Sequence, residues 1–139
     1  MEITRAPFKK IAKSYLGQIF RPYVLVFLKS TKTEELFPAE MVVDSGADYT
    51  LLPNRYAFYL GIDLEKDCRA ETTLGVGGSE TIYLYKEGIA IKIGDWQKQI
   101  PVGFLERDDV PPLLGRLECL EVLKVIFEKR ETVLENSGA

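Results

Sequence analysis

Hydrophobic and polar residues alternate along most of this chain, in short runs separated by glycine, proline and charged residues. Alternation with a period of two, rich in β-branched and aromatic residues, is typical of half-buried strands. Beyond the first twenty residues, helical spacing is confined to residues 53–60, which Gly61 ends, and residues 116–120. The pattern therefore predicts an all-β domain with little helix. The predicted strands cover residues 20–28, 36–43, 68–74, 80–85, 89–93, 96–104, 122–127 and 132–134.

The first twenty residues fit two periods. Hydrophobic residues recur at helical spacing from Phe8 to Phe20, with lysines opposite them, whereas alternation indicates a strand from Tyr15 onward. Residues 1–19 are therefore predicted to be an N-terminal extension whose helical or strand character stays open. A basic amphipathic helix can lie on a membrane, but packing on its own domain is the commoner outcome, so membrane association is not expected.

Length and composition set the domain organisation. With 139 residues, 46% of them hydrophobic, the chain can bury one core. Residues 20–135 are predicted to form that domain, and residues 136–139 a disordered tail. The formal net charge of −3 provides no basic field, so a nucleic-acid partner is not expected.

Histidine is absent, which excludes His-based catalytic triads and most zinc sites. Residues 106–109, three of which are acidic, lack the spacing of a calcium loop, so neither a metal nor another cofactor is expected. Cys68 and Cys119 are isolated and are interpreted as reduced packing residues rather than nucleophiles. With no apolar run of membrane-spanning length and no signal-like N-terminus, a cytoplasmic location is predicted.

The strongest candidate for chemistry is Asp44, which lies at a bend between the apolar runs 41–43 and 51–52. A carboxylate between two strands that enter a core needs a partner or a function. Ordinary turn chemistry is the competing interpretation, because Asp-Ser-Gly is also a common turn sequence. The surrounding residues strengthen the catalytic interpretation, as does a second apolar pair with a glycine, Leu113 to Gly115, far downstream.

A glycine-rich stretch, residues 75–78, separates two of the predicted strands. A phosphate-binding loop is one interpretation, but the stretch lacks the spacing, the lysine and the following helix that such a loop requires. A hairpin with a conformationally free tip fits the pattern better.

Two of these motifs resemble those of the retropepsins, the retroviral-type aspartic proteases. Residues 43–50 are similar to the catalytic motif, and Leu113, Leu114 and Gly115, followed by Arg116, resemble the second hallmark. The resemblance covers roughly Tyr23 to Leu134 and is strongest to the small, single-lobe cellular members. It implies a closed, barrel-like, homodimeric β fold with one short C-terminal helix, and hydrolysis of peptide bonds.

The resemblance also implies roles for individual residues. The chain has only one Asp-Ser-Gly triplet, so the second carboxylate of the protease dyad would come from a second copy across a two-fold axis. The alternative is a catalytically silent retropepsin-like module that dimerises or binds peptides. The implied roles are catalysis for Asp44, the active-site loop for Ser45, Gly46 and Ala47, substrate binding for Gly46, Asp48, Gly75, Val76, Gly77 and Gly78, and a structural ion pair for Asp48 with Arg116.

Overall fold

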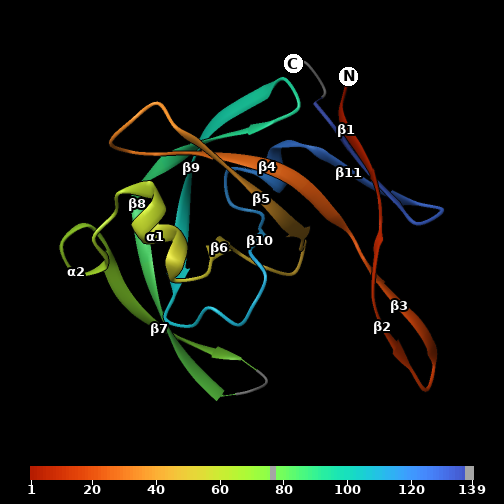
Figure 1. Ribbon diagram of the computed structural model, residues 1–139, viewed down its shortest axis with the longest axis horizontal. Helices are drawn as coiled ribbons and strands as arrows, with labels where there is room; N and C mark the ends of the chain where they lie inside the picture. The colour runs from red at the N-terminus through yellow and green to blue at the C-terminus, as the bar shows by residue number, and fades with distance from the viewer. Residues whose placement is uncertain (76–77, 137–139) are drawn as a thin grey trace.

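Strands make up most of this protein, for which a computed structural model describes residues 1–75 and 78–136 (Figure 1). Three short helical segments are α1 (Arg55–Leu60), α2 (Leu64–Asp67) and the 3-10 helix η1 (Leu120–Val122). The strands are β1 (Glu2–Pro7), β2 (Lys9–Ser14), β3 (Gly17–Arg21), β4 (Tyr23–Lys29), β5 (Leu36–Val43), β6 (Thr50–Leu52), β7 (Arg69–Gly75), β8 (Gly78–Ile93), β9 (Trp96–Leu105), β10 (Leu113–Leu114), β11 (Lys124–Glu128) and β12 (Glu131–Glu135).

Seven strands form the main sheet, in the order β4-β5-β10-β6-β9-β8-β7. Strand β4 also pairs with β8, at Phe27–Lys92 and Leu28–Ile91, so the pairings lead from β4 through five other strands back to β4. The core consists of inward-facing aliphatic and aromatic side chains of these strands, as alternation predicts. Its fully buried members include Val24, Leu28, Met41, Leu52, Ile91, Ile100, Phe104 and Leu114.

Strand β10 is only two residues long, yet it joins the two strands that carry the Asp44 loop. Leu113 and Leu114 pair in parallel with Val42 and Val43 of β5, and Leu113 pairs in the antiparallel direction with Leu51 of β6. Leu114 is fully buried. The apolar pair is therefore a central strand that fixes the two ends of the loop.

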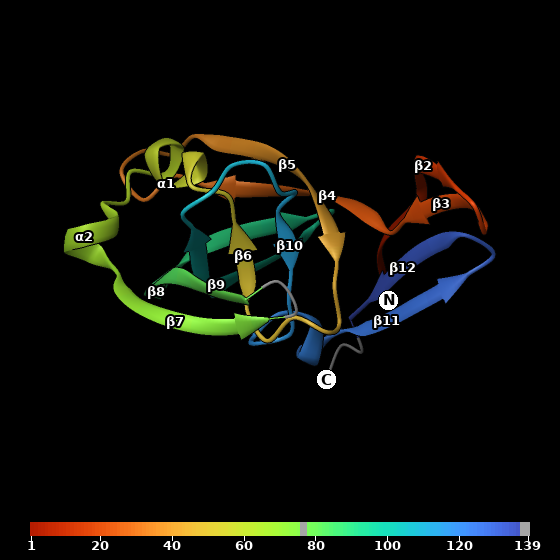
Figure 2. The same cartoon turned by 90° about the horizontal axis from the view of Figure 1, so that it is seen from below.

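Both ends of the chain lie in a second sheet, of order β1-β12-β11, which we call the terminal sheet (Figure 2). Strand β1 pairs with β12 in the antiparallel direction, so that Ala6 lies opposite Thr132 and Pro7 lies opposite Glu131. Residues 2–7, 9–14 and 17–21 are strands, and the helical alternative for this segment is not what forms. Pairing with β12 holds the first of these strands, whereas residues 9–21, where the helical spacing lies, form strands that pair with each other.

Among the described strands, β2 and β3 pair with each other alone and form a projecting hairpin, which we call the arm (Lys9–Arg21; Figure 1). A tight turn closes the arm at Gly17, whose φ of 130° favours glycine. The hydroxyl of Ser14 accepts a hydrogen bond from Leu16 N and donates one to Gly17 O. This turn, together with the alternation of hydrophobic and polar residues that follows it, explains why residues 17–21 form a strand.

The helical predictions have mixed outcomes. Helix α1 ends at Gly61, which has a left-handed φ of 74°, as predicted. The helix predicted over residues 116–120 is wrong in position: successive turns lead into η1, and Glu118 has a φ of 59°. Lys98 holds that turn, because its ammonium donates to both the carbonyl and the carboxylate of Glu118.

Two further differences concern segment boundaries. The strands predicted over residues 80–85 and 89–93 are one strand, β8, with an irregularity where Gly88 packs against β9. A Cβ atom on Gly88 would lie 2.3 Å from the carbonyl oxygen of Ile100. Within the predicted tail, Asn136 bonds to Met1 through its backbone, whereas residues 137–139 lie outside the described residues.

Candidate active site

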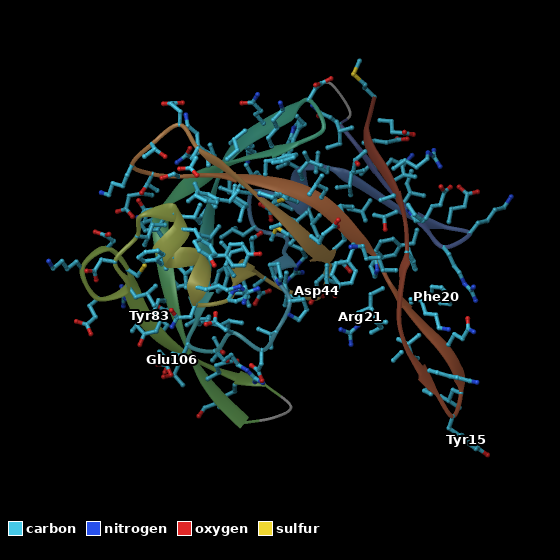
Figure 3. All side chains as sticks on the ribbon, viewed as in Figure 1. Tyr15, Phe20, Arg21, Asp44, Tyr83 and Glu106 are labelled. Atoms are coloured by element: carbon cyan, nitrogen blue, oxygen red, sulfur yellow. The ribbon has the colours of Figure 1, made fainter. Side chains whose placement is uncertain are left out.

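The Asp44 loop is fixed at its start by two strands. Val43 N donates to Pro22 O at 2.8 Å, and Asp44 N donates to Leu114 O at 3.0 Å. Asp44 is therefore the first residue beyond the buried end of β5, and its backbone is still paired with β10. Figure 3 shows it near the centre of the molecule, between the main sheet and the base of the arm.

Inside the loop, the Asp44 carboxylate accepts one hydrogen bond. Gly46 N donates to Asp44 Oδ1 at 3.0 Å, and Ala47 N donates to the Asp44 carbonyl at 3.1 Å. These are the contacts of an Asx turn, so turn chemistry and a site coexist here. Asp44 is half-buried, Ser45 and Gly46 are exposed, and no other described residue bonds to or ion-pairs with this carboxylate. One of its oxygens is therefore available to a water or a second acid.

Beneath the loop, Gly115 lies against the backbone of the returning strand. Its amide donates to the hydroxyl of Thr50 at 3.1 Å, and a Cβ atom on Gly115 would lie 2.1 Å from Tyr49 O. Only glycine allows this approach. Thr50 is fully buried and satisfies an amide that would otherwise be orphaned.

Thr50 is the positioning residue that the sequence did not single out. It belongs to the motif, but its role depends on Gly115, 65 residues away. A hydroxyl residue at the first position of a buried strand, directly after a functional loop, is the signal that could have identified it.

The structure brings Asp48 and Arg116 together at the end of the loop. The Arg116 guanidinium donates to the Asp48 carboxylate, Arg116 N donates to Ala47 O at 3.0 Å, and Leu117 N donates to Asp48 O at 2.9 Å. The Arg116 side chain is 49% exposed and the Asp48 side chain is 74% exposed, so the ion pair contributes little to the stability of a single chain. The backbone bonds lock the two motifs into one unit.

The glycine-rich hairpin lies apart from this unit. Strands β7 and β8 pair up to Gly75 and Gly78, while Val76 and Gly77 lie outside the described residues. Leu74 is exposed near the end of the hairpin. Among the described residues, no hydrogen bond or ion pair joins the hairpin to the Asp44 loop, so Gly75 and Gly78 are not bonded to Asp44.

An apolar cavity of about 290 Å³ lies beside the Asp48–Arg116 pair. Tyr49 and Leu117 form one wall, and residues of β8 and β9, among them Leu84, Tyr85 and Val102, form the other. A larger, polar hollow of about 490 Å³ lies around the β4–β5 turn, at the far end of β5 from Asp44. We consider the apolar cavity the better site for a side chain, because it adjoins the loop.

The two cysteines are poor candidates for nucleophiles. Burial raises the thiol pKa of Cys68 to about 11 and that of Cys119 to about 12. Thiolate is the reactive form, so both side chains are inert near neutral pH. Within residues 1–75 and 78–136, no three acidic or cysteine side chains converge as metal ligands, and no helix has the length and apolarity needed to cross a membrane.

Comparisons with known proteins agree with this geometry. A family model described as aspartyl protease matches residues 31–116, which include both motifs. The fold matches the crystal structure of a retropepsin-like aspartic protease from Rickettsia conorii, with a TM-score of 0.63 and 23% sequence identity over 96% of this chain and 100% of that chain. A search of curated proteins found no match.

Proposed function

This chain belongs to the aspartyl protease family and has a retropepsin-like fold, and we propose that it is an aspartic endopeptidase that works as a homodimer. The supporting observation is the Asp44 carboxylate. It stands at the end of a buried strand, is held by one hydrogen bond from Gly46 N, and leaves the other oxygen free.

The reaction requires two carboxylates that share one proton. The sequence contains a single Asp-Ser-Gly triplet, and no described residue places a second acid in hydrogen-bond contact with Asp44. A two-fold axis beside Asp44 would bring the same residue of a second copy against it. Ser45, exposed next to it, would then contact the partner loop across the axis.

Charge repulsion decides the protonation states of the two Asp44 carboxylates in the proposed dimer. Two carboxylates in contact cannot both ionise, so at the working pH one is protonated and the other is not. The ionised Asp44 accepts a proton from water while the water oxygen bonds to the scissile carbonyl carbon. The protonated Asp44 donates a hydrogen bond to the carbonyl oxygen. Collapse of the tetrahedral intermediate breaks the C–N bond, and the departing nitrogen takes up a proton from the pair.

The remaining site residues position the substrate in this proposal. Asp48, held by Arg116, presents a carboxylate to the main-chain amides of an extended peptide. The apolar cavity next to it accepts an apolar side chain. The β7–β8 hairpin, with glycines 75 and 78 at its paired end, covers the peptide and must open to release the products.

The test compares the wild type with Asp44→Asn on an unbiased peptide library between pH 3 and pH 8. We expect the variant to lose cleavage by at least about a thousandfold, because the amide removes the shared proton. Asp95→Asn, in the exposed β8–β9 turn, is the matched control and should cleave like the wild type. Equal cleavage by wild type and Asp44→Asn would refute the proposal. Cleavage by neither would favour the silent binding module.

A further inference from the structure

The arm is a feature that the proposed site does not use. Within the part of the chain that the structure describes, its strands pair only with each other, and its tip residues, Tyr15 and Leu16, are 103% and 92% exposed. In Figure 1 it projects from the body in the same direction as the β7–β8 hairpin. Large hydrophobic side chains at the end of a projecting hairpin indicate a contact with another molecule.

Strand pairing divides the arm into two faces. Lys9 lies opposite Arg21 and Ala12 lies opposite Ile19, so these four residues share one face. The Lys9 ammonium lies 3.3 Å from the carboxylate of Glu40 on β5, which turns this face toward the strand that carries Asp44. Figure 3 accordingly shows Arg21 on the Asp44 side of the arm.

On the opposite face Phe20 is half-buried, whereas the residues of the Ile19 face are exposed. Phe20 points away from Ile19, and the guanidinium of Arg130 lies 4.1 Å from the centre of its ring. Ile19 and its neighbour across the strand irregularity, Ile11, remain 37% and 39% exposed. The uncovered apolar face therefore looks toward the side on which a partner beside Asp44 would lie.

The charge of the chain is divided unequally between the arm and the body. The arm, residues 9–21, contains four basic side chains and no acidic side chain, a net charge of +4. The other fourteen basic and twenty-one acidic side chains give the rest of the chain a net charge of −7. An acidic body attracts the basic segment of another copy, and it repels an anionic lipid surface. Charge complementarity thus favours a second copy of this chain over a membrane.

We propose that the arm clasps a second copy of this chain, with the Ile19 face and the Tyr15–Leu16 tip packed on the body of the partner. The inference rests on the proposed function, since catalysis requires the same dimer. The terminal strands β1, β11 and β12 already pair among themselves within one chain. The arm is the segment that extends beyond them and is free to reach across the axis.

Sedimentation equilibrium of the full-length chain tests the clasp. We expect Tyr15→Ser/Leu16→Ser, and separately Ile19→Ser, to raise the dimer dissociation constant about tenfold or more, as loss of apolar anchors at an interface does. Phe58→Ser is the matched control, because Phe58 is also 85% exposed but lies on α1. Any peptide cleavage that the arm variants lose should return when their concentration is raised above the new dissociation constant.

Each result separates the clasp from catalysis. If the wild type and the arm variants dimerise with the same dissociation constant, the clasp is overturned and the protease proposal stands. A wild type that cleaves peptides as a monomer would overturn both the clasp and the shared dyad. If the tip variant lost binding to phosphatidylserine vesicles while its dissociation constant stayed that of the wild type, the arm would be a lipid contact and the clasp would be refuted.

Discussion

Gly115→Ala is the substitution whose effect on the Asp44 loop follows most directly from the structure. The added Cβ atom would lie 2.1 Å from Tyr49 O and 2.8 Å from Thr50 N, and both obstacles are backbone. The backbone must therefore move by about 1 Å, in the segment that connects the Asp44 loop to β6, to relieve overpacking of this kind. We expect a loss of about 3 kcal/mol in the free energy of unfolding.

The matched control is Gly103→Ala in β9. There the added atom would meet the ends of two leucine side chains, at 2.8 and 3.3 Å, which can rotate away. We expect a cost of about 1 kcal/mol for this change, measured by urea unfolding of both variants. A displacement of about 1 Å at the loop should also lower peptide cleavage by Gly115→Ala about a hundredfold relative to the wild type. Equal stability and activity of the two variants would refute the idea that backbone contact at Gly115 shapes the loop.

The other predictions concern the contacts around this loop. Thr50→Val should cost about 1–3 kcal/mol in urea unfolding, because it leaves a buried amide without its acceptor, whereas Thr50→Ser should restore most of the loss; equal values would contradict this role. Arg116→Glu places a second carboxylate beside Asp48 and should lower the melting temperature more than the control Arg69→Glu, which breaks the exposed Arg69–Glu71 pair. A larger loss in Arg69→Glu would contradict a structural role for the Asp48–Arg116 pair. With a pKa of about 12, Cys119 should resist iodoacetamide at pH 8 in the native protein and react after unfolding, and rapid native labelling would show that the thiol is not buried.

Local chemistry made part of this fold predictable. Gly61 ends α1 through a left-handed backbone that glycine favours, and alternation located most strands of the main sheet. The two motifs carry their signal in a few adjacent residues, so residues 43–50 and the apolar pair Leu113–Leu114 with Gly115 were recognisable from the sequence, although this pair was not predicted to be strand β10. The letters of each motif are adjacent in the sequence, whereas the contacts that shape the Asp44 loop are not.

Features that depend on distant contacts were not predictable in this way. Strand β1 forms because β12 pairs with it, although its neighbours have helical spacing. The continuity of β8 depends on Gly88 packing against Ile100, and the turn at Glu118 depends on Lys98. The role of Thr50 appears only when Gly115 is placed above it. In each case the deciding partner lies elsewhere along the chain.

The separation between the two halves of the site has a consequence for biosynthesis. The loop around Asp44 takes its shape from residues about seventy positions later, through bonds that span 65 and 68 residues. A nascent chain on the ribosome has no β10 to hold β5 and β6 until that late segment emerges. The Asp44 carboxylate is therefore unorganised until residues 113–116 have left the ribosome, and the proposed protease activity cannot appear before that point.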